Sequence, residues 1–181
     1  MKILVVVDMQ NDFITGSLGT KEAQAIVPNV KKKVEEAVKN GYPIIYTRDT
    51  HFAKYLETKE GRKLPVMHCI SGSNGWRIPD ELLPPGSYDK YTILDKFTFA
   101  SDDLCHVIVK YLDGPVVDEV ELVGLCTDIC VVSNALLLQA KFFNMRFEIS
   151  VDATCCAGVT PETHEAALKT MEMCQINVRR G

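Results

Sequence analysis

The chain alternates short apolar runs with segments in which apolar residues recur at helical spacing. Residues 3–7 are a continuous run of Ile, Leu and Val, which is typical of a parallel strand covered on both faces. Residues 28–39 instead have apolar side chains at helical spacing, and Gly41 follows as the residue that ends this helix. Repetition of this alternation predicts parallel strands with helices on both faces of their sheet. Further strands are expected at residues 43–47, 91–94, 119–123, 146–151 and 175–178, the last at a sheet edge, and further helices at residues 79–83, 101–112, 131–140 and 161–173.

We therefore predict a fold of the α/β class with three α/β/α layers and a mainly parallel, Rossmann-like sheet of about six strands. No repeat, low-complexity tract or linker divides the chain, so residues 1–181 are expected to form one domain. Within it, residues 48–90 are mostly loop, rich in Gly, Pro and charged side chains. A connection of this length favours a functional loop over a passive one.

Composition excludes several classes of function. The 20 Lys and Arg residues do not exceed the 24 Asp and Glu residues, so no nucleic-acid partner is expected. No apolar run approaches the roughly 20 residues that a membrane span requires, and the first apolar run is too short for a signal peptide. The seven cysteines are an odd number without the spacing of a disulfide scaffold. We expect them to be reduced thiols in a cytoplasmic protein.

The most informative stretch is the turn between the strand at 119–123 and the helix at 131–140. Thr127 or Asp128 is placed to cap this helix. With Thr127 as the cap, Cys130 falls in the first helical turn, beside backbone N–H groups that lack intrahelical partners. Those N–H groups favour a thiolate, and they can hold the oxyanion that forms when the thiolate attacks a carbonyl. The alternative is a small apolar cysteine in a core helix.

Side chains with reactive groups also follow the other predicted strands. In an open parallel sheet, ligands bind beyond the carboxyl ends of the strands. A carboxylate that takes the thiol proton and an ammonium that favours the thiolate together activate a cysteine as a nucleophile. This combination favours Cys130 as a nucleophile over a packing residue. The side chains just past the predicted strands are Asp8, Asp49, His51, Lys96, Cys130 and Asp152.

Several motifs are similar to those of a known family. They are residues 6–13 (VVDMQNDF), 47–51 (TRDTH), 68–72 (HCISG), 95–96 (DK) and 124–131 (GLCTDICV), and residues 152–154 (DAT) and 164–168 (HEAAL) also fit. On these residues the chain resembles the isochorismatase-like cysteine hydrolase superfamily, and within it most resembles the nicotinamidases. The resemblance implies a parallel-sheet α/β fold, as the hydrophobic pattern independently predicts. It also implies an amidase that converts nicotinamide and water to nicotinic acid and ammonia through a cysteine thioester.

The same resemblance implies roles for individual residues. Cys130 is expected to attack the amide carbonyl, Asp8 to take its proton and pass it to the leaving ammonia, and Lys96 to stabilise the thiolate and orient Asp8. Relatives have a cis peptide that corresponds to the bond between Leu125 and Cys126. It is expected to aim the amides of Cys126 and Cys130 into the oxyanion hole.

Nicotinamidases also hold a divalent metal ion that binds the pyridine nitrogen of the substrate. By resemblance, Asp49, His51 and His68 match three of its protein ligands. Many relatives have another histidine between these two, and this chain has none. We prefer Glu57 over Glu60 as the fourth ligand, because an aromatic and an apolar residue precede Glu57 and can pin it to the pocket. The mixed nitrogen and oxygen donors suit zinc first, with manganese and iron as alternatives.

Aromatic residues next to the catalytic positions are candidates for substrate binding. We expect Phe13, Phe97 and Phe99 to contact the ring of the substrate, and Trp76 to belong to the same pocket wall.

Two other functions stay open on the sequence. One is a metal-free amidase of the same superfamily that acts on an N-carbamoyl compound, a ureide or another small amide. The other is a thiol redox protein that uses Cys126 and Cys130 as its pair. The expected partner is a small-molecule amide, and relatives suggest a homo-oligomer. His106 and His164 are expected at a helix surface or in the core.

Overall fold

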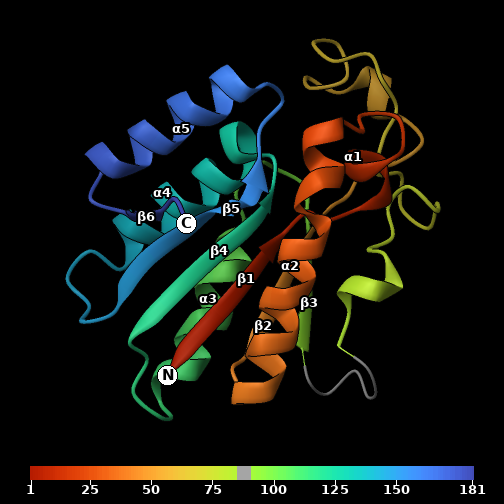
Figure 1. The fold of residues 1–181 in the computed structure, drawn as a ribbon. Helices are drawn as coiled ribbons and strands as arrows, with labels where there is room; N and C mark the ends of the chain where they lie inside the picture. The colour runs from red at the N-terminus through yellow and green to blue at the C-terminus, as the bar shows by residue number, and fades with distance from the viewer. Residues whose placement is uncertain (85–90) are drawn as a thin grey trace.

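The computed structural model describes residues 1–84 and 91–181 and is built around a six-stranded sheet (Figure 1). The strands lie in the order β3-β2-β1-β4-β5-β6, and every neighbouring pair is parallel. The predicted α/β fold with a parallel sheet is confirmed. The strands are β1 (Lys2–Val7), β2 (Ile44–Asp49), β3 (Tyr91–Lys96), β4 (Glu119–Leu125), β5 (Glu148–Ala157) and β6 (Asn177–Arg179).

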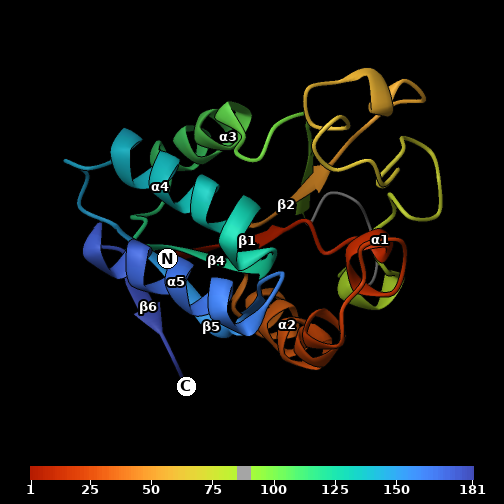
Figure 2. The same ribbon diagram turned by 90° about the horizontal axis from the view of Figure 1, so that it is seen from above.

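Helices cover both faces of this sheet (Figure 2). Side chains of β1 alternate between the two faces, as they must in a strand. Ile3, Val5 and Val7 pack in the core on the side of α3, α4 and α5, whereas Leu4 and Val6 pack on the side of α2. No helix in the described residues is both long enough and apolar enough to cross a membrane. The long helices are α2 (Lys21–Asn40), α3 (Asp102–Leu112), α4 (Val132–Lys141) and α5 (Pro161–Met173).

Helix α2 begins at Lys21 and not at the predicted position, residue 28. The hydroxyl of Thr20 caps it by accepting a hydrogen bond from the N–H of Ala23 at 3.0 Å. Pro28 therefore lies inside the helix, where it lacks the N–H of a normal helical hydrogen bond. The helix continues past it because the apolar side chains on either side, Ile26 and Val30, are both buried against the sheet. A proline at the start of a helix and one in its interior are not distinguished by hydrophobic spacing alone.

Several strands extend further than predicted, and this moves one candidate residue. Strand β5 continues to Ala157, so Asp152 lies within it and not past its end. The carboxylate of Asp152 pairs with Nζ of Lys33 on α2 at 2.7 Å. Asp49 and Lys96 are the last residues of β2 and β3, and they are register partners. Asp152 thus belongs to the packing of α2 against the sheet, while Asp49 and Lys96 stand side by side at its carboxyl edge.

The long connection between β2 and β3 contains little regular structure. In its described part, residues 50–84, two 3₁₀ turns occur, η1 (Tyr55–Glu57) and η2 (Asp80–Leu82), and the second replaces the helix predicted at 79–83. An isolated parallel bridge between His51 and Ile70 holds its outgoing and returning parts together. A short helix that was not predicted, α1 (Asn11–Ile14), follows β1. Residues 85–90 of the predicted loop lie outside the described residues.

Candidate active site

Three side chains from distant parts of the chain meet beyond the carboxyl ends of the strands. Asp8 directly follows β1, Lys96 ends β3, and Cys130 lies in the turn after β4. The Nζ atom of Lys96 is 2.7 Å from Oδ2 of Asp8 and 3.4 Å from Sγ of Cys130. All three side chains are buried. The structure therefore brings the three predicted catalytic residues together, with the ammonium in contact with both of the others.

Asp8 adopts an unusual backbone conformation. Its φ of 46° lies in the left-handed region, which aspartate tolerates better than most residues. Its Oδ1 accepts a hydrogen bond from the hydroxyl of Thr47 at 2.7 Å, while Oδ2 faces Lys96. Each carboxylate oxygen thus has its own partner, and the side chain is fixed toward the thiol. Such conformations cluster at functional sites.

Burial sets the protonation of this group. It raises the pKa of Asp8, since the opposing effect of Lys96 is only partial and the charge of Asp49 raises the pKa further. Burial and the charge of Asp8 raise the pKa of Cys130 well above its ordinary value. Burial alone would lower the pKa of Lys96, but the charges of Asp8, Cys130 and Asp49 raise it. A protonated lysine therefore faces a carboxyl group and a thiol that both resist ionisation.

The turn that carries Cys130 is wound more widely than an α-helix. Residues Thr127–Val131 form a π-helical turn that runs directly into α4. The peptide bond between Leu125 and Cys126 is cis, as the family resemblance implies. Just before it, Gly124 has a φ of 117°, and a Cβ there would lie 2.1 Å from the carbonyl oxygen of Val7. Glycine is required at this position because the backbones of β4 and β1 approach so closely.

Thr127 and Asp128 do not cap the helix after this turn, contrary to the prediction. Cys126 occupies the N-cap position, and no side chain caps the turn. The hydroxyl of Thr127 instead lies 2.8 Å from Nδ1 of His164 on α5. The carboxylate of Asp128 accepts a hydrogen bond from the N–H of Val159 at 3.0 Å. Both residues therefore tie the turn of the cysteine to α5 and to the loop before it.

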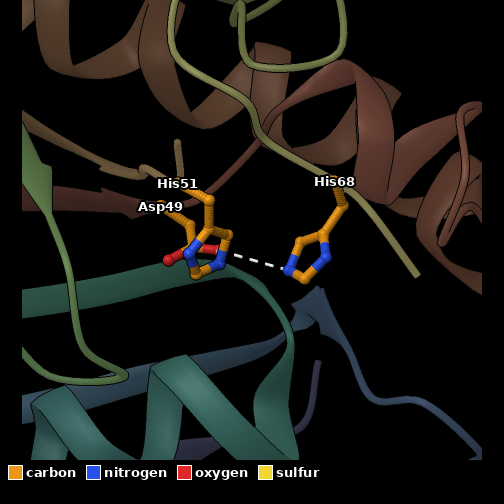
Figure 3. Close-up of side chains that lie close together, drawn as sticks. All are labelled: Asp49, His51 and His68. Atoms are coloured by element: carbon orange, nitrogen blue, oxygen red, sulfur yellow. Dashed lines mark ion pairs between the residues drawn. The ribbon is translucent and has the colours of Figure 1, made fainter. Parts of the chain in front are cut away.

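Asp49, His51 and His68 form a second group beside the first (Figure 3). One potential ligand atom of each lies within 4.8 Å of the others. The Nε2 atoms of His51 and His68 are 3.0 and 3.5 Å from Oδ2 of Asp49. Burial alone would raise the pKa of Asp49, but its close contacts with the two histidines and the charge of Lys96 lower it. Two imidazole nitrogens and a carboxylate are a donor set for zinc, manganese or iron.

The surroundings of the two imidazoles leave the nitrogens that face Asp49 free to bind an ion. Nδ1 of His68 is 2.8 Å from the carbonyl oxygen of Val66, so in the neutral ring Nδ1 carries the proton and Nε2 presents a lone pair. Nε2 of His51 is buried, and although Oδ2 of Asp49 lies 3.0 Å away, it makes no well-aligned hydrogen bond in the described part of the chain. A buried polar atom without a partner is costly unless a ligand takes it. These residues therefore fit a divalent metal ion.

Glu60, and not Glu57, lies beside these histidines. Its Oε1 is 3.7 Å from Nε2 of His51 and 3.9 Å from Nε2 of His68. Glu57 is exposed, and its carboxylate lies 3.9 Å from a lysine three residues earlier. Tyr55 is buried as expected, but the turn that begins there directs Glu57 outward, and the next turn brings Glu60 back. The preference for Glu57 is therefore corrected to Glu60.

Asp49 belongs to both groups, since its Oδ1 is 3.5 Å from Nζ of Lys96 while Oδ2 faces the histidines. Its backbone is held by Gln10, a fully buried residue that the sequence analysis did not single out. Oε1 of Gln10 accepts a hydrogen bond from the N–H of Asp49 at 2.7 Å. Nε2 of Gln10 donates to the carbonyl oxygens of Asp49 at 2.8 Å and of Trp76 at 2.9 Å. The available signal was its place in the VVDMQNDF motif, two residues after Asp8.

A cavity of about 820 Å³ opens above Cys130. Phe13, Phe97 and Phe99, the predicted aromatic residues, all line it. Phe13 lies deep, with its ring centroid 5.6 Å from that of His68, whereas the side chains of Phe97 and Phe99 are exposed. The cavity therefore has a deep reactive end and an aromatic mouth. Other lining residues from the two groups are Asp49, His51, Glu60, Cys126 and Cys130.

Trp76 is not part of this wall, contrary to the prediction. Its Nε1 donates a hydrogen bond to the hydroxyl of Thr50 at 2.8 Å. The guanidinium of Arg48 lies 3.4 Å from its ring centroid. Trp76 thus packs against the carboxyl end of β2, and its carbonyl oxygen accepts the hydrogen bond from Gln10.

The remaining candidates are the cysteines of the possible redox pair and two further histidines. All seven cysteines are free thiols, and Cys126 and Cys130 are not bonded to each other. His106 is exposed on α3, 3.8 Å from Asp103, as expected of a helix-surface histidine. His164 is half-buried against the cysteine turn, in contact with Thr127.

Comparison with known proteins covers nearly the whole chain. The family model described as Isochorismatase domain matches residues 2–180. The chain is 25% identical over 216 residues to a nicotinamidase of Saccharomyces cerevisiae, with 98% of this chain and 99% of that one covered. It superposes on the pyrazinamidase of Pyrococcus horikoshii in complex with zinc with a TM-score of 0.82 and 26% identity, over 99% of each chain. It superposes on the N-carbamoylsarcosine amidase of Thermoplasma acidophilum with a TM-score of 0.78 and 28% identity, over 99% of this chain and 95% of that one.

Proposed function

Because this chain belongs to the isochorismatase family, we propose that it is a cysteine-dependent amidohydrolase that converts nicotinamide and water to nicotinic acid and ammonia. One observation carries the proposal. The ammonium of Lys96 contacts both the carboxylate of Asp8 and the thiol of Cys130, and Cys130 lies at the buried end of the cavity. A carboxylate, an ammonium and a thiol in this arrangement form an activated nucleophile.

In the first half of the reaction, Sγ of Cys130 attacks the amide carbonyl as Asp8 takes the thiol proton. Because the pKa of Asp8 is raised by burial, the carboxyl group holds this proton well. The backbone N–H groups of Cys126 and Cys130 hold the oxyanion of the tetrahedral intermediate. The C–N bond then breaks, Asp8 gives the proton to the departing nitrogen, and ammonia leaves behind a thioester on Cys130.

In the second half, water hydrolyses the thioester. Asp8, again ionised, takes a proton from the water as its oxygen attacks the carbonyl carbon. The C–S bond breaks, the acid leaves, and the proton on Asp8 restores the thiol of Cys130. Lys96 stays protonated throughout, since its pKa is raised by the charges around it, and it stabilises the thiolate at both stages.

Asp49, His51, His68 and Glu60 would hold a divalent metal ion next to the cysteine. When bound, the ion supplies a Lewis acid for the ring nitrogen of nicotinamide. Zinc is the first candidate, because the similar pyrazinamidase of P. horikoshii was solved in complex with zinc. The paired histidines favour an amide with a ring nitrogen over the N-carbamoyl compounds of the alternative function. Phe13, Phe97 and Phe99 are the aromatic side chains available to contact the ring.

Ammonia release from nicotinamide by the purified protein tests the proposal. Wild type is expected to turn over nicotinamide, Cys130→Ala to lose the activity while it keeps its fold, and Cys126→Ala to remain active because it retains the attacking sulfur. Circular dichroism checks the fold of each variant. Loss of activity in Cys126→Ala together with an active Cys130→Ala would contradict the mechanism and favour the redox function. Release of ammonia from N-carbamoyl compounds only, unaffected by a chelator, would favour the metal-free amidase.

A further inference from the structure

The cavity is larger than one small ring requires. Cavities of about 300–1,000 Å³ bury most of a drug-sized ligand, and the volume here is about 820 Å³. Its deep end is formed by buried groups, among them Cys130, Asp49 and the two histidines. Its outer part is lined by residues of the connection after β2, including Thr58, Lys59, Lys63 and Leu64. A substrate with its amide at Cys130 therefore has room to extend toward these residues.

The outer part of the cavity has uncompensated positive charge. Lys59 and Lys63 both line it, and within residues 1–84 and 91–181 neither has a carboxylate within ion-pair distance. The two carboxylates in the described lining, Glu60 and Asp49, face the histidines of the deep end and do not pair with these lysines. Among the described residues of the lining, no other side chain carries a formal negative charge.

The backbone that carries these lysines is tightly folded. Tyr55, which is 1% exposed, donates a hydrogen bond from its hydroxyl to the carbonyl oxygen of Leu64 at 2.9 Å and so closes the segment. The N–H of Lys63 donates to the carbonyl oxygen of Glu60 at 2.8 Å. At Gly61 a Cβ would lie 2.1 Å from the carbonyl oxygen of Tyr55, so the turn is wound as closely as the chain allows. The two side chains therefore start from fixed points on the same wall, although their ammonium groups reach into solvent.

We propose that Lys59 and Lys63 form a subsite for an anionic group, so that the preferred substrates are aromatic primary amides that carry a carboxylate or a phosphate on the side of the ring away from the amide. The aromatic mouth formed by Phe97 and Phe99 suits the body of such a molecule, and the two ammonium groups suit its charged end. This inference rests on the proposed amide hydrolysis and extends it to a class of substrate.

Three nicotinamide derivatives test the subsite. The first carries a carboxymethyl group on ring carbon 5, which is bonded neither to the carbon that bears the amide nor to the ring nitrogen. The second carries a phosphonomethyl group at the same position, and the third carries the uncharged methyl ketone of similar size there. The measured quantity is the ratio of kcat/KM for each anionic derivative to that for the ketone. Wild type is expected to prefer the anionic derivatives, and the larger ratio of the two identifies carboxylate or phosphate as the better ligand.

Variants that keep the apolar stem but remove the charge assign this preference to the lysines. Lys59→Met and Lys63→Met are each expected to lower the ratio about two- to fivefold, the size of an exposed ion pair, and the double variant about tenfold. Lys54→Met is the matched control, since Lys54 is on the same segment, is exposed and does not line the cavity. Its ratio should equal that of wild type. Raising the ionic strength from about 0.05 M to about 0.5 M should also lower the wild-type ratio.

The outcomes separate this inference from the proposed function. A wild type that hydrolyses nicotinamide but treats the charged and uncharged derivatives alike overturns the subsite alone. So does a preference for the anionic derivatives that survives in the double variant. Hydrolysis of the anionic derivatives without hydrolysis of nicotinamide supports the subsite and contradicts nicotinamide as the substrate.

Discussion

Two groups of charged side chains lie on the same sheet and differ in the balance between cations and carboxylates. At the carboxyl ends of the strands, one ammonium group contacts two carboxylates and a thiol. On the face of the sheet that α2 covers, nearer the amino ends of β1 and β4, three cations form ion pairs with three carboxylates. The first group is Lys96 with Asp8, Asp49 and Cys130, and the second is Lys2, Lys33 and Arg179 with Glu119, Glu121 and Asp152.

The balance decides how the acids titrate. In the second group, burial opposes ionisation of Asp152, but hydrogen bonds from Lys33 and Thr154 lower its pKa. Partners likewise lower the pKa of Glu119 against the effect of burial. In the first group, the two histidines and Lys96 lower the pKa of Asp49, whereas burial prevails at Asp8 and raises its pKa. Acids with sufficient partners thus stay ionised and hold the sheet together, whereas the shortage of cations at Asp8 leaves a carboxyl group that resists ionisation.

The largest effect is expected from breaking the first group. Asp8→Asn removes the proposed acceptor of the thiol proton, and Lys96→Met removes the charge proposed to stabilise the thiolate. Each is expected to lower kcat for nicotinamide by about 10³-fold, and the double variant by little more, because groups that act as a unit are not additive. Steady-state assays of ammonia release measure all three. Losses that multiply in the double variant would show that one of the two residues is only structural.

Breaking the second group should affect stability and not catalysis. Glu121 is 0% exposed, with Nζ of Lys2 at 3.2 Å and Nζ of Lys33 at 3.4 Å. Glu121→Gln removes the buried carboxylate that these cations share and leaves three cations with two carboxylates, Glu119 and Asp152. We expect it to lower the free energy of unfolding by about 3 kcal/mol. Urea denaturation measures this loss, with Glu35→Gln on the exposed face of α2 as the control. A fall in kcat per folded molecule as large as that of Asp8→Asn would contradict the division of roles.

A divalent metal ion would supply the cation that the first group lacks. Glu60→Gln is expected to weaken zinc binding at least tenfold, as measured by competition with a chromogenic chelator. Glu57→Gln is the matched control, because Glu57 is on the same segment but is exposed. Chelation of the metal should also slow nicotinamide turnover. Equal zinc affinity in both variants would show that the fourth ligand, if any, is another group.

The smallest effect concerns acid pH. Because the folded-state pKa of Asp152 lies below its ordinary value of 3.8, its ionised form stabilises the fold above about pH 4, and this contribution is lost as the pH falls through the folded-state pKa. Asp152→Asn should therefore reduce stability at pH 7 and flatten its decline between about pH 5 and pH 2. Urea denaturation across this range tests it. An unchanged slope would mean that other carboxylates, such as Glu119, account for the acid sensitivity.

The fold and most side chains of the candidate site could be predicted from the sequence, and each failed prediction has its own physical reason. Parallel strands must bury both faces, so their apolar runs were visible, and the residues just past them fell at one edge of the sheet. Asp152 failed because β5 continues through it, and its partner Lys33 is 119 residues away. Whether Glu57 or Glu60 reaches the histidines depends on the direction of a tight turn, and the spacing of residues along the sequence does not predict that direction. Gln10 was missed because its role consists of hydrogen bonds to the backbone of a distant strand.

The place of Lys96 on β3 links the proposed catalytic group to the periphery of the fold. In the described residues β3 pairs on one side only, with β2, and Lys96 is the register partner of Asp49 at the last position of the pairing. Strands alternate their side chains, so a slip of one residue would turn Lys96 away from both Asp8 and Cys130. Edge strands open at lower free energy than the central ones. Local unfolding of this one outer strand should therefore abolish enzymatic activity. Heat or denaturant can inactivate the enzyme while the central strands of the sheet are still folded.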